Sequence, residues 1–331
     1  MEFDKTGFLE DRFSTDQLMW LHPFGEAAAR RGEKLYLVGG VVRDLVLKTT
    51  AIDYDLVIDG DVHGFCTDIT RLGATVEAQS QFRTMKIRFE DKILDVATSR
   101  REHYEVPGAL PVIDPAPIDV DLRRRDFTIN AMAISLLPDS FGEFLDPYDG
   151  LADLQRGRID VLHEQSFRDD PTRILRAIRY EQRLEFDIGS VTESYLHRDK
   201  QYITTVSSDR LHNELERIFS EERSSGILQR IEDFGILRTI SQNLAWNDHL
   251  SEVYASAIEL YDKDIPKWDL YLALVGFNAN ANGTGELLEH FELPTDQSRY
   301  LVAAANFKKD VNTVVLDATN ASTMVFALDD V

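Results

Sequence analysis

The order of hydrophobic and polar residues along the first part of the chain predicts helices and strands in alternation. Residues 14–31 repeat apolar side chains at helical spacing behind a Ser-Thr-Asp start, which is typical of an amphipathic helix. Residues 34–38 and 52–58 are short runs with many apolar side chains, and we expect both to be strands. Between them Gly39-Gly40 marks a turn, and residues 41–47 predict a helix directly after it.

The pattern continues in the same way to about residue 148 and then changes. The expected elements are a helix at 62–72, strands at 75–78, 85–89 and 92–98, a helix at 122–132 and a strand at 133–137. The last two of the three grouped strands should form a hairpin about Glu90-Asp91. Prolines and glycines crowd residues 106–117, which predicts a loop. After residue 151 no strand pattern is convincing, and from Pro171 onward the spacing is helical, so an α/β head followed by an all-helical remainder is predicted.

Size and composition place the chain among water-soluble globular proteins. At 331 residues it exceeds what one core usually organises, so two or three domains are expected. It has no apolar run of about 18 residues, which excludes an ordinary membrane helix. The N-terminus lacks the plan of a signal peptide, and a cytoplasmic protein is expected. The single cysteine, Cys66, cannot form an internal disulfide and is expected to be a buried, small apolar side chain.

The formal charge of −22 at first argues against a nucleic-acid partner, because phosphate binding usually draws on surplus Lys and Arg. The acids are unevenly distributed, however. Residues 83–183 contain 16 basic and 19 acidic side chains, whereas residues 221–331 contain 8 basic and 18 acidic ones. The acid excess is therefore concentrated toward the C-terminus, and arginine clusters in the middle of the chain remain candidates for phosphate contacts.

The turn at Gly39-Gly40 has no side chains to block a close approach, and the helix after it would offer N-terminal amides to an anion. Arg43, one turn into that helix, can reach a phosphate. The same letters also fit a plain strand-to-helix turn with a surface arginine. No Walker A loop and no complete G-x-G-x-x-G is present, so the commoner nucleotide folds are not supported.

Asp53 and Asp55 are separated by one residue on a β-rich run, so both carboxylates point to one face of the strand. Paired carboxylates bind hard cations such as Mg²⁺. Two such ions would activate an attacking hydroxyl and steady the leaving oxygens of an in-line displacement at phosphorus. Asp95, in a second apolar strand, is a candidate third acid. A D-x-D pair also occurs in turns and at solvated edges, and Asp95 alone also fits a hydrogen-bonded strand end.

Two arginine-rich segments complete the candidates. Arg123, Arg124 and Arg125 are expected at the start of a helix, where nearby apolar residues would turn part of the segment inward; a solvated basic face is the other interpretation.

In the second segment Asp170 precedes a helix on which arginines recur every three residues, at Arg173, Arg176 and Arg179. A carboxylate and a guanidinium together match the pairing edge of cytosine or adenine and oppose that of uracil or guanine. A helix-capping aspartate with a surface arginine ladder remains the alternative.

Taken together, these segments resemble the class II tRNA nucleotidyltransferase and bacterial poly(A) polymerase family. The resemblance covers about residues 35–220 and rests on seven stretches in order: LVGGVVRD (37–44), IDYDLVIDG (52–60), LDVATSRREHYEVPG (94–108), DLRRRDFTINAMAI (121–134), DPYDGLADLQRGRIDVL (146–162), FRDDPTRILRAIRYEQRLEF (167–186) and, more loosely, DRLHNELERI (209–218).

The resemblance implies an α/β head of the polymerase-β nucleotidyltransferase type, at residues 1–148, followed by an all-helical neck, body and tail. The neck, 149–230, would select the base, and the body and tail, 231–331, would hold the acceptor arm of tRNA. Segment 100–121 corresponds to the family's flexible loop, which is linked to the switch from C to A addition. The implied site residues are Asp53 and Asp55 for Mg²⁺, with Asp95 as a less uniform acidic position; Gly39, Gly40 and Arg43 for the triphosphate; Arg125 for the nucleotide; Asp170 and Arg173 for the base; and Arg176 and Arg179 as supports of the nucleotide.

The implied activity is template-independent addition of CMP, AMP or both to the 3′ end of tRNA from CTP and ATP, with release of pyrophosphate. An A-adding enzyme, a CC-adding enzyme, a poly(A) polymerase and a catalytically silent RNA-binding protein on the same fold stay open as alternatives. The chain departs from the family pattern in having Asp169-Asp170 where Glu-Asp is usual, and in a C-terminal part after about residue 230 that matches nothing assignable.

Overall fold

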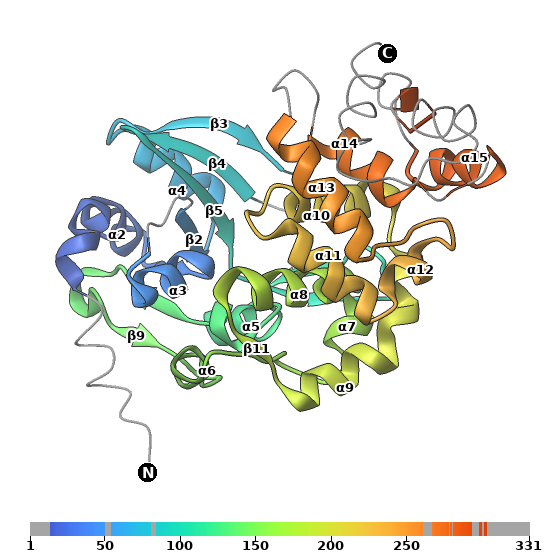
Figure 1. Cartoon of the computed structure of the whole chain (residues 1–331). Coiled ribbons are helices and arrows are strands. Elements are labelled where there is room, and N and C mark those ends of the chain that lie inside the picture. The colour runs from blue at the N-terminus through green and yellow to red at the C-terminus, as the bar shows by residue number, and fades with distance from the viewer. Residues whose placement is uncertain are drawn as a thin grey trace. The chain divides into compact units, whose positions relative to one another are not determined.

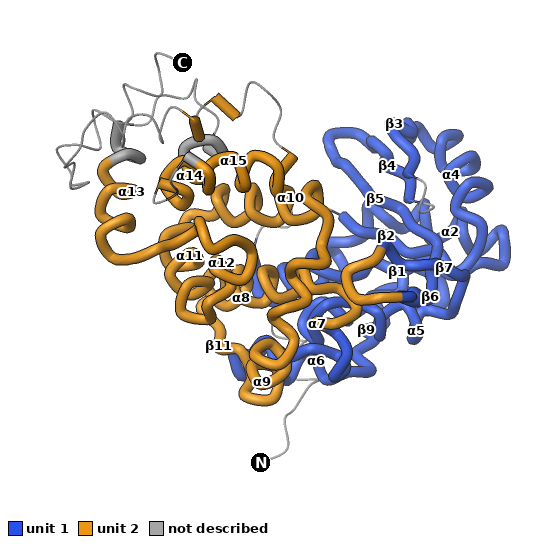
Figure 2. Tube along the Cα trace, turned by 90° about the vertical axis from the view of Figure 1, so that its right-hand side faces the viewer, with its two compact units in different colours: residues 1–105, 110–166 blue, residues 106–109, 167–331 orange. Residues whose placement is uncertain are grey.

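The structure is a computed structural model of the whole chain (Figure 1). It divides into two compact units, Met1–Glu105 with Leu110–Ser166, and Val106–Ala109 with Phe167–Val331 (Figure 2). The residues that the structure describes are 14–49, 54–80, 84–260, 267–277, 279, 281–292, 298–299 and 301–302.

The first unit is built on a seven-stranded mixed sheet with the order β3-β4-β5-β2-β1-β8-β9. Its strands are β1 (Lys34–Val38), β2 (Tyr54–Asp59), β3 (Thr75–Gln79), β4 (Thr84–Phe89), β5 (Lys92–Thr98), β8 (Ala133–Ser135) and β9 (Phe144–Leu145). Strands β2 and β5 run parallel, whereas β1 pairs antiparallel with both β2 and β8. The expected hairpin joins β4 and β5, and Glu90 at its turn has a φ of 53°.

The helical elements of this unit are η1 (Thr15–Leu21), α2 (His22–Arg30), α3 (Gly40–Leu47), α4 (Val62–Thr70), α5 (Ile118–Arg123), η2 (Thr128–Asn130), η3 (Pro138–Ser140) and α6 (Gly150–Arg156). The predicted helix at 14–31 is therefore a 3₁₀ segment followed by an α-helix. Helices α2 and α4 pack on the sheet, and α3 follows the Gly39-Gly40 turn as expected. Cys66, on α4, is buried as predicted.

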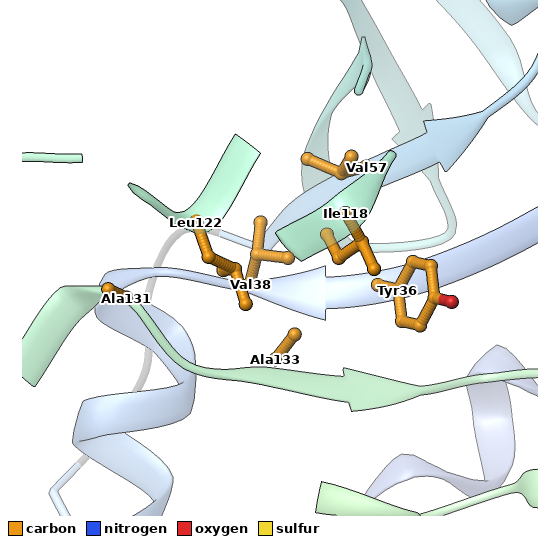
Figure 3. Close-up of a cluster of buried hydrophobic side chains, with 7 residues drawn as sticks. All are labelled: Tyr36, Val38, Val57, Ile118, Leu122, Ala131 and Ala133. Carbon is orange, nitrogen blue, oxygen red and sulfur yellow. The ribbon is translucent and has the colours of Figure 1, made fainter. Parts of the chain in front are cut away.

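Side chains on the opposite face of the sheet from α2 and α4 meet helix α5. Tyr36, Val38 and Val57 come from the two central strands, and Ile118 and Leu122 of α5 pack over them (Figure 3). Because side chains alternate along a strand, Asp55 lies on the same face as Val57, two residues on. Asp55 is therefore on the face of the sheet against which α5 packs.

The helix predicted at 122–132 is wrong. Helix α5 ends at Arg123, so the arginine triplet lies at the end of a helix and not at its start. Phe127 is extended, with φ −134° and ψ 154°, and bridges to Val161. The Asp126 carboxylate accepts hydrogen bonds from the Phe127 amide and from Asn130 Nδ2, at 2.9 and 3.0 Å. These side-chain bonds compete with the helical ones and interrupt the helix.

The loop predicted at 106–117 is only partly a loop. Strand β6 (Arg100–His103) pairs antiparallel with β7 (Val112–Pro115), and the two form a separate small sheet. The prolines did not exclude a strand here because a two-stranded sheet leaves each strand an outer edge that donates no ladder bond.

The second unit is largely helical, as predicted. Its helices are α7 (Ser166–Asp169), α8 (Thr172–Leu184), α9 (Ser190–Asp199), η4 (Lys200–Thr205), α10 (Ser208–Phe219), α11 (Ser224–Asp233), α12 (Ile236–Ile240), α13 (Asp248–Leu260), α14 (Lys267–Val275) and α15 (Ala281–His290). Helix α8 packs against α10 and α11. Two short strands lie beyond residue 151, where no strand was expected: β10 (Arg158–Ile159) in the first unit and β11 (Asp187–Ile188) in the second. Within the described ranges no helix is long and apolar enough to cross a membrane.

Candidate active site

The end of β1 and the start of β2 lie side by side because the two strands are antiparallel, with Leu37 opposite Leu56. The turn that follows β1 is therefore next to Asp55. Gly39 has φ 79° and ψ −140°, a conformation that is essentially confined to glycine. A Cβ built at Gly39 would lie 2.7 Å from Arg125 Nη1 and 3.5 Å from Asp55 Oδ2. The turn, the carboxylate and the guanidinium are thus gathered at one place in the first unit.

Asp55 and Asp95 are Cα partners on the parallel strands β2 and β5. Partners in a parallel pair point to the same face of the sheet, so both half-buried carboxylates face the same side. On the neighbouring strand β4, the Cα partner of Asp95 is Lys86. Asp53, the other predicted carboxylate, lies outside the described residues.

The donor set at this place suits a hard cation, because carboxylate oxygens are the ligands that Mg²⁺ prefers. Two carboxylates, those of Asp55 and Asp95, are in register there. Among the residues that the structure describes, no group of three or more acidic, His or Cys side chains forms a closed metal cluster. The described chain thus supplies part of a ligand set of the right chemistry, next to the turn.

Arg125 is held beside the turn by a buried carboxylate. Its Nη2 donates to Asp121 Oδ2 at 3.1 Å, and Asp121 has no exposed surface. Asp121 Oδ1 also accepts from Arg124 Nε at 2.9 Å. Burial by itself would raise the pKa of Asp121, but the charges of Arg125 and Arg124 outweigh it and hold that pKa below its ordinary value. Asp121 is therefore a permanent anion at neutral pH.

Arg43 is a buried arginine rather than a surface one, with 3% of its area exposed. Its Nη1 donates to Asn130 Oδ1 at 2.8 Å, and its Nε donates to the neighbouring Asp44 at 2.9 Å. A Cβ at Gly40 would lie 3.5 Å from Arg43 Nη2, so the guanidinium packs under the first residue of α3. Asn130 in turn donates to Asp126, and the chain of bonds fixes Arg43 under the Gly39-Gly40 turn.

The second unit carries the other predicted residues. Asp170 lies between α7 and α8, and its Oδ1 accepts three hydrogen bonds: from the Thr172 amide at 3.1 Å, from Thr172 Oγ1 at 2.6 Å and from Arg210 Nη2 at 2.6 Å. Arg210 comes from α10, and its Nη1 also donates to the Gly108 carbonyl oxygen at 3.0 Å. Asp170 thus caps the start of α8, and its carboxylate orientation is fixed from two sides.

Two arginines of α8, Arg176 and Arg179, face helix α10. Arg173 and Arg179 are buried, whereas Arg176 is half-buried. Glu214 of α10, itself buried, forms ion pairs with Arg176 and Arg179 at 3.6 and 3.8 Å. Arg179 also pairs with Glu221 at 3.2 Å. Arg176 and Arg179 are therefore part of the packing between α8 and α10, and Arg173 is buried as well, so the three do not form a solvated ladder.

Sequence reasoning missed several residues that organise these groups. Asp121 stands three and four residues before Arg124 and Arg125, which is the spacing of helical ion pairs and could have identified it. Thr172, two residues after Asp170, fits a local capping pattern. Arg210 lies 40 positions after Asp170, and Glu214 is on the same helix as Arg210. Both belong to the loosely matching stretch 209–218, which implied no role for either residue.

Comparison with known families matches both units. The family model of the poly A polymerase head domain matches residues 35–160, and that of the probable RNA and SrmB-binding site of polymerase A matches residues 185–246. The chain is 35% identical to the A-adding tRNA nucleotidyltransferase of Aquifex aeolicus over 273 residues, which is 79% of this chain and 33% of that protein. It is 36% identical to the A-adding tRNA nucleotidyltransferase of Halalkalibacterium halodurans over 275 residues, which is 80% of this chain and 63% of that protein. The chain thus spans between a third and two thirds of the length of these relatives. Further relatives bear the names CC-adding tRNA nucleotidyltransferase and CCA-adding enzyme.

Solved structures agree with this grouping. The apo form II of a CCA-adding enzyme superposes with a TM-score of 0.83 at 28% identity, covering 99% of this chain and 84% of that one. A tRNA nucleotidyltransferase complexed with a primer tRNA and an incoming ATP analogue superposes with a TM-score of 0.72 at 28% identity, covering 93% of this chain and 98% of that one. The chain thus has the fold of these proteins, and it belongs to the class II tRNA nucleotidyltransferase family.

Proposed function

We propose that this protein adds nucleotides to the 3′ end of tRNA without a template, taking AMP from ATP, CMP from CTP, or both. The observation that carries the proposal is the gathering of Asp55, Asp95 and Arg125 around the Gly39 turn. Carboxylates, a guanidinium and helix N-terminal amides in one place suit a nucleoside triphosphate with its cations. AMP is the nucleotide we expect first, because both relatives described above are A-adding enzymes.

In the proposed reaction the 3′ hydroxyl of tRNA loses its proton to solvent, and its oxygen forms a bond to the α-phosphorus. The bond from that phosphorus to the pyrophosphate oxygen breaks, and pyrophosphate leaves. Asp55, Asp95 and Asp53 would hold Mg²⁺, and the ion would lower the pKa of the attacking hydroxyl and neutralise the leaving oxygens. Arg125 would bind the triphosphate at the turn. Arg43 would keep Gly39-Gly40 and the start of α3 in the conformation that receives it.

The second unit would select the base. Asp170 presents a carboxylate that accepts a hydrogen bond from an exocyclic amine, which adenine and cytosine carry and uracil lacks. Arg173 would donate to a ring acceptor of the same base. Arg176 and Arg179 would support the nucleotide from the face of α8 on which they pair with Glu214. The proposed division is a head at 1–148, a base-selecting neck at 149–230 and a tRNA-binding body and tail at 231–331.

Incorporation of labelled ATP and CTP into tRNA transcripts tests the proposal. Three transcripts are needed: one lacking the CCA end, one ending in CC and one ending in CCA, each with Mg²⁺. Extension of the CC-ended transcript by ATP alone would identify an A-adding enzyme. Growth of the shortest transcript to CC, or to a complete CCA end, would identify a CC-adding or a CCA-adding enzyme, and continued A-tailing a poly(A) polymerase. Failure to extend any transcript would contradict the proposal and favour a silent RNA-binding protein.

A further inference from the structure

A cluster of five charged side chains lies at the base of the β6–β7 hairpin in the first unit. It joins Asp121, Arg124 and Arg125 around the end of α5 to Arg100 and Glu102 of β6. Three positive and two negative side chains meet there, and Arg125 is the member of the cluster that meets the Gly39 turn.

Asp121 is the centre of this cluster. It is fully buried, and its two oxygens accept four hydrogen bonds. The donors are the Arg100 amide at 3.1 Å, Arg124 Nε at 2.9 Å, Arg124 Nη2 at 2.8 Å and Arg125 Nη2 at 3.1 Å. Asp121 therefore connects α5, β6 and Arg125 through its hydrogen bonds.

Arg125 depends on Asp121 for its orientation. Its Nη2 is bonded to Asp121, and its Nη1 is the atom that a Gly39 Cβ would meet at 2.7 Å. Its Nε is buried and has no hydrogen-bond partner within the described part of the chain. Asp121 thus fixes Nη2 of the guanidinium. Because the guanidinium is planar and rigid, Nη1 is then directed at the turn.

We propose that Asp121 is a positioning residue for the nucleotide, acting through Arg125. It holds the guanidinium against the Gly39 turn so that Nη1 is ready for a phosphate oxygen before the nucleotide binds. Glu102 supports this arrangement, because it accepts from Arg124 Nη1 at 2.9 Å and so keeps Arg124 on the other side of Asp121. The inference rests on the proposed function, since it needs a triphosphate at the turn.

The test is a double-mutant cycle on the full chain with labelled ATP and the CC-ended transcript, or with CTP and the transcript lacking CCA if only CTP is used. We expect Asp121→Asn to raise the KM for the nucleotide about tenfold, with a smaller change in kcat, because a preset charged contact is lost. In an Arg125→Ala background the same substitution should change KM by less than about twofold. Glu33→Gln, which removes a carboxylate bonded to Arg31 in the same unit, is the matched control and should leave KM unchanged.

Two results would overturn the proposal and leave Asp121 a purely structural residue. In the first, Asp121→Asn raises the nucleotide KM equally with and without Arg125. In the second, it lowers the melting temperature and leaves KM unchanged. If Asp121→Asn does not fold, Arg125→Lys decides. A lysine keeps the charge but cannot bond Asp121 and stand at the turn together. We expect it to raise KM nearly as far as Arg125→Ala; a wild-type KM would refute the inference. A wild-type protein that extends no transcript would instead refute the proposed function.

Discussion

Replacing Gly39 by alanine should damage both the stability of the first unit and its affinity for nucleotide. The backbone at Gly39, with φ 79° and ψ −140°, lies in a region that costs a residue with a Cβ about 1–3 kcal/mol. The new Cβ would also stand 2.7 Å from Arg125 Nη1, closer than any real contact, so the guanidinium must move away from the turn.

The two effects have separate magnitudes. A backbone cost of about 2 kcal/mol corresponds to a fall of about 4–8 °C in melting temperature for a unit of this size. Displacing Arg125 removes a charged hydrogen bond to phosphate of about 1.5–3 kcal/mol. This loss predicts a KM for the nucleotide that is raised about tenfold to a hundredfold.

Two other glycines provide matched controls. Gly32 also has a positive φ, of 70°, but a Cβ there would meet nothing within 4 Å, so Gly32→Ala should lower stability and leave KM unchanged. Gly40 begins α3 without a positive φ, and its Cβ would make only ordinary contact with Arg43 at 3.5 Å, so Gly40→Ala should leave the melting temperature nearly unchanged. Thermal unfolding and single-nucleotide incorporation measure the two effects. A Gly39→Ala protein with wild-type KM would refute the placement of Arg125 at the nucleotide.

Four further results are expected. Asp55→Asn should lower Mg²⁺-dependent incorporation on the order of a thousandfold while a gel-shift assay still detects tRNA binding, since a cation ligand contributes several kcal/mol to phosphoryl transfer; retained activity would contradict the assignment. Asp170→Asn replaces one accepting oxygen of the carboxylate by a donating NH₂ group. In a competition between ATP and UTP, the preference for AMP over UMP incorporation should fall about tenfold. An unchanged preference would exclude Asp170 from base selection. Arg125 and Arg124 lower the pKa of Asp121 in the folded state, so the contribution of Asp121 to stability is present above the ordinary value of 3.8 and is lost as the pH falls through the folded pKa. Urea unfolding should therefore show that the difference in unfolding free energy between wild type and Asp121→Asn becomes smaller below about pH 4. A difference that stays constant with pH would contradict this reasoning. Burial, with a smaller effect of Asp61, raises the pKa of the Cys66 thiol to about 12, so iodoacetamide at pH 8 should label Cys66 only after unfolding in urea, and rapid labelling of the folded protein would place it at the surface instead.

Local patterns were sufficient for most elements of the first unit. The strand at Lys34–Val38, the turn after it and the hairpin between β4 and β5 follow from apolar runs and turn residues, because these elements depend on bonds between near neighbours. The Gly39-Gly40 turn also lies where the sequence predicts it, but the register that makes Asp55 and Asp95 Cα partners depends on the pairing of β2 with β5, which alternation does not reveal. The helix at 122–132 failed because Asp126 bonds its own neighbourhood, a competition that periodicity does not reveal.

Patterns along the chain are thus enough for the order of most elements, the family and the residue types of the candidate site. The tertiary structure decided how those residues are held. Arg43 is buried because Asn130, 87 positions away, folds back onto it, and Arg176 and Arg179 face inward because α10 brings Glu214 against α8. Arg210 reaches Asp170 from 40 positions away. Such contacts depend on how distant segments pack, and packing selects partners by shape and charge in space, which spacing along the chain does not record.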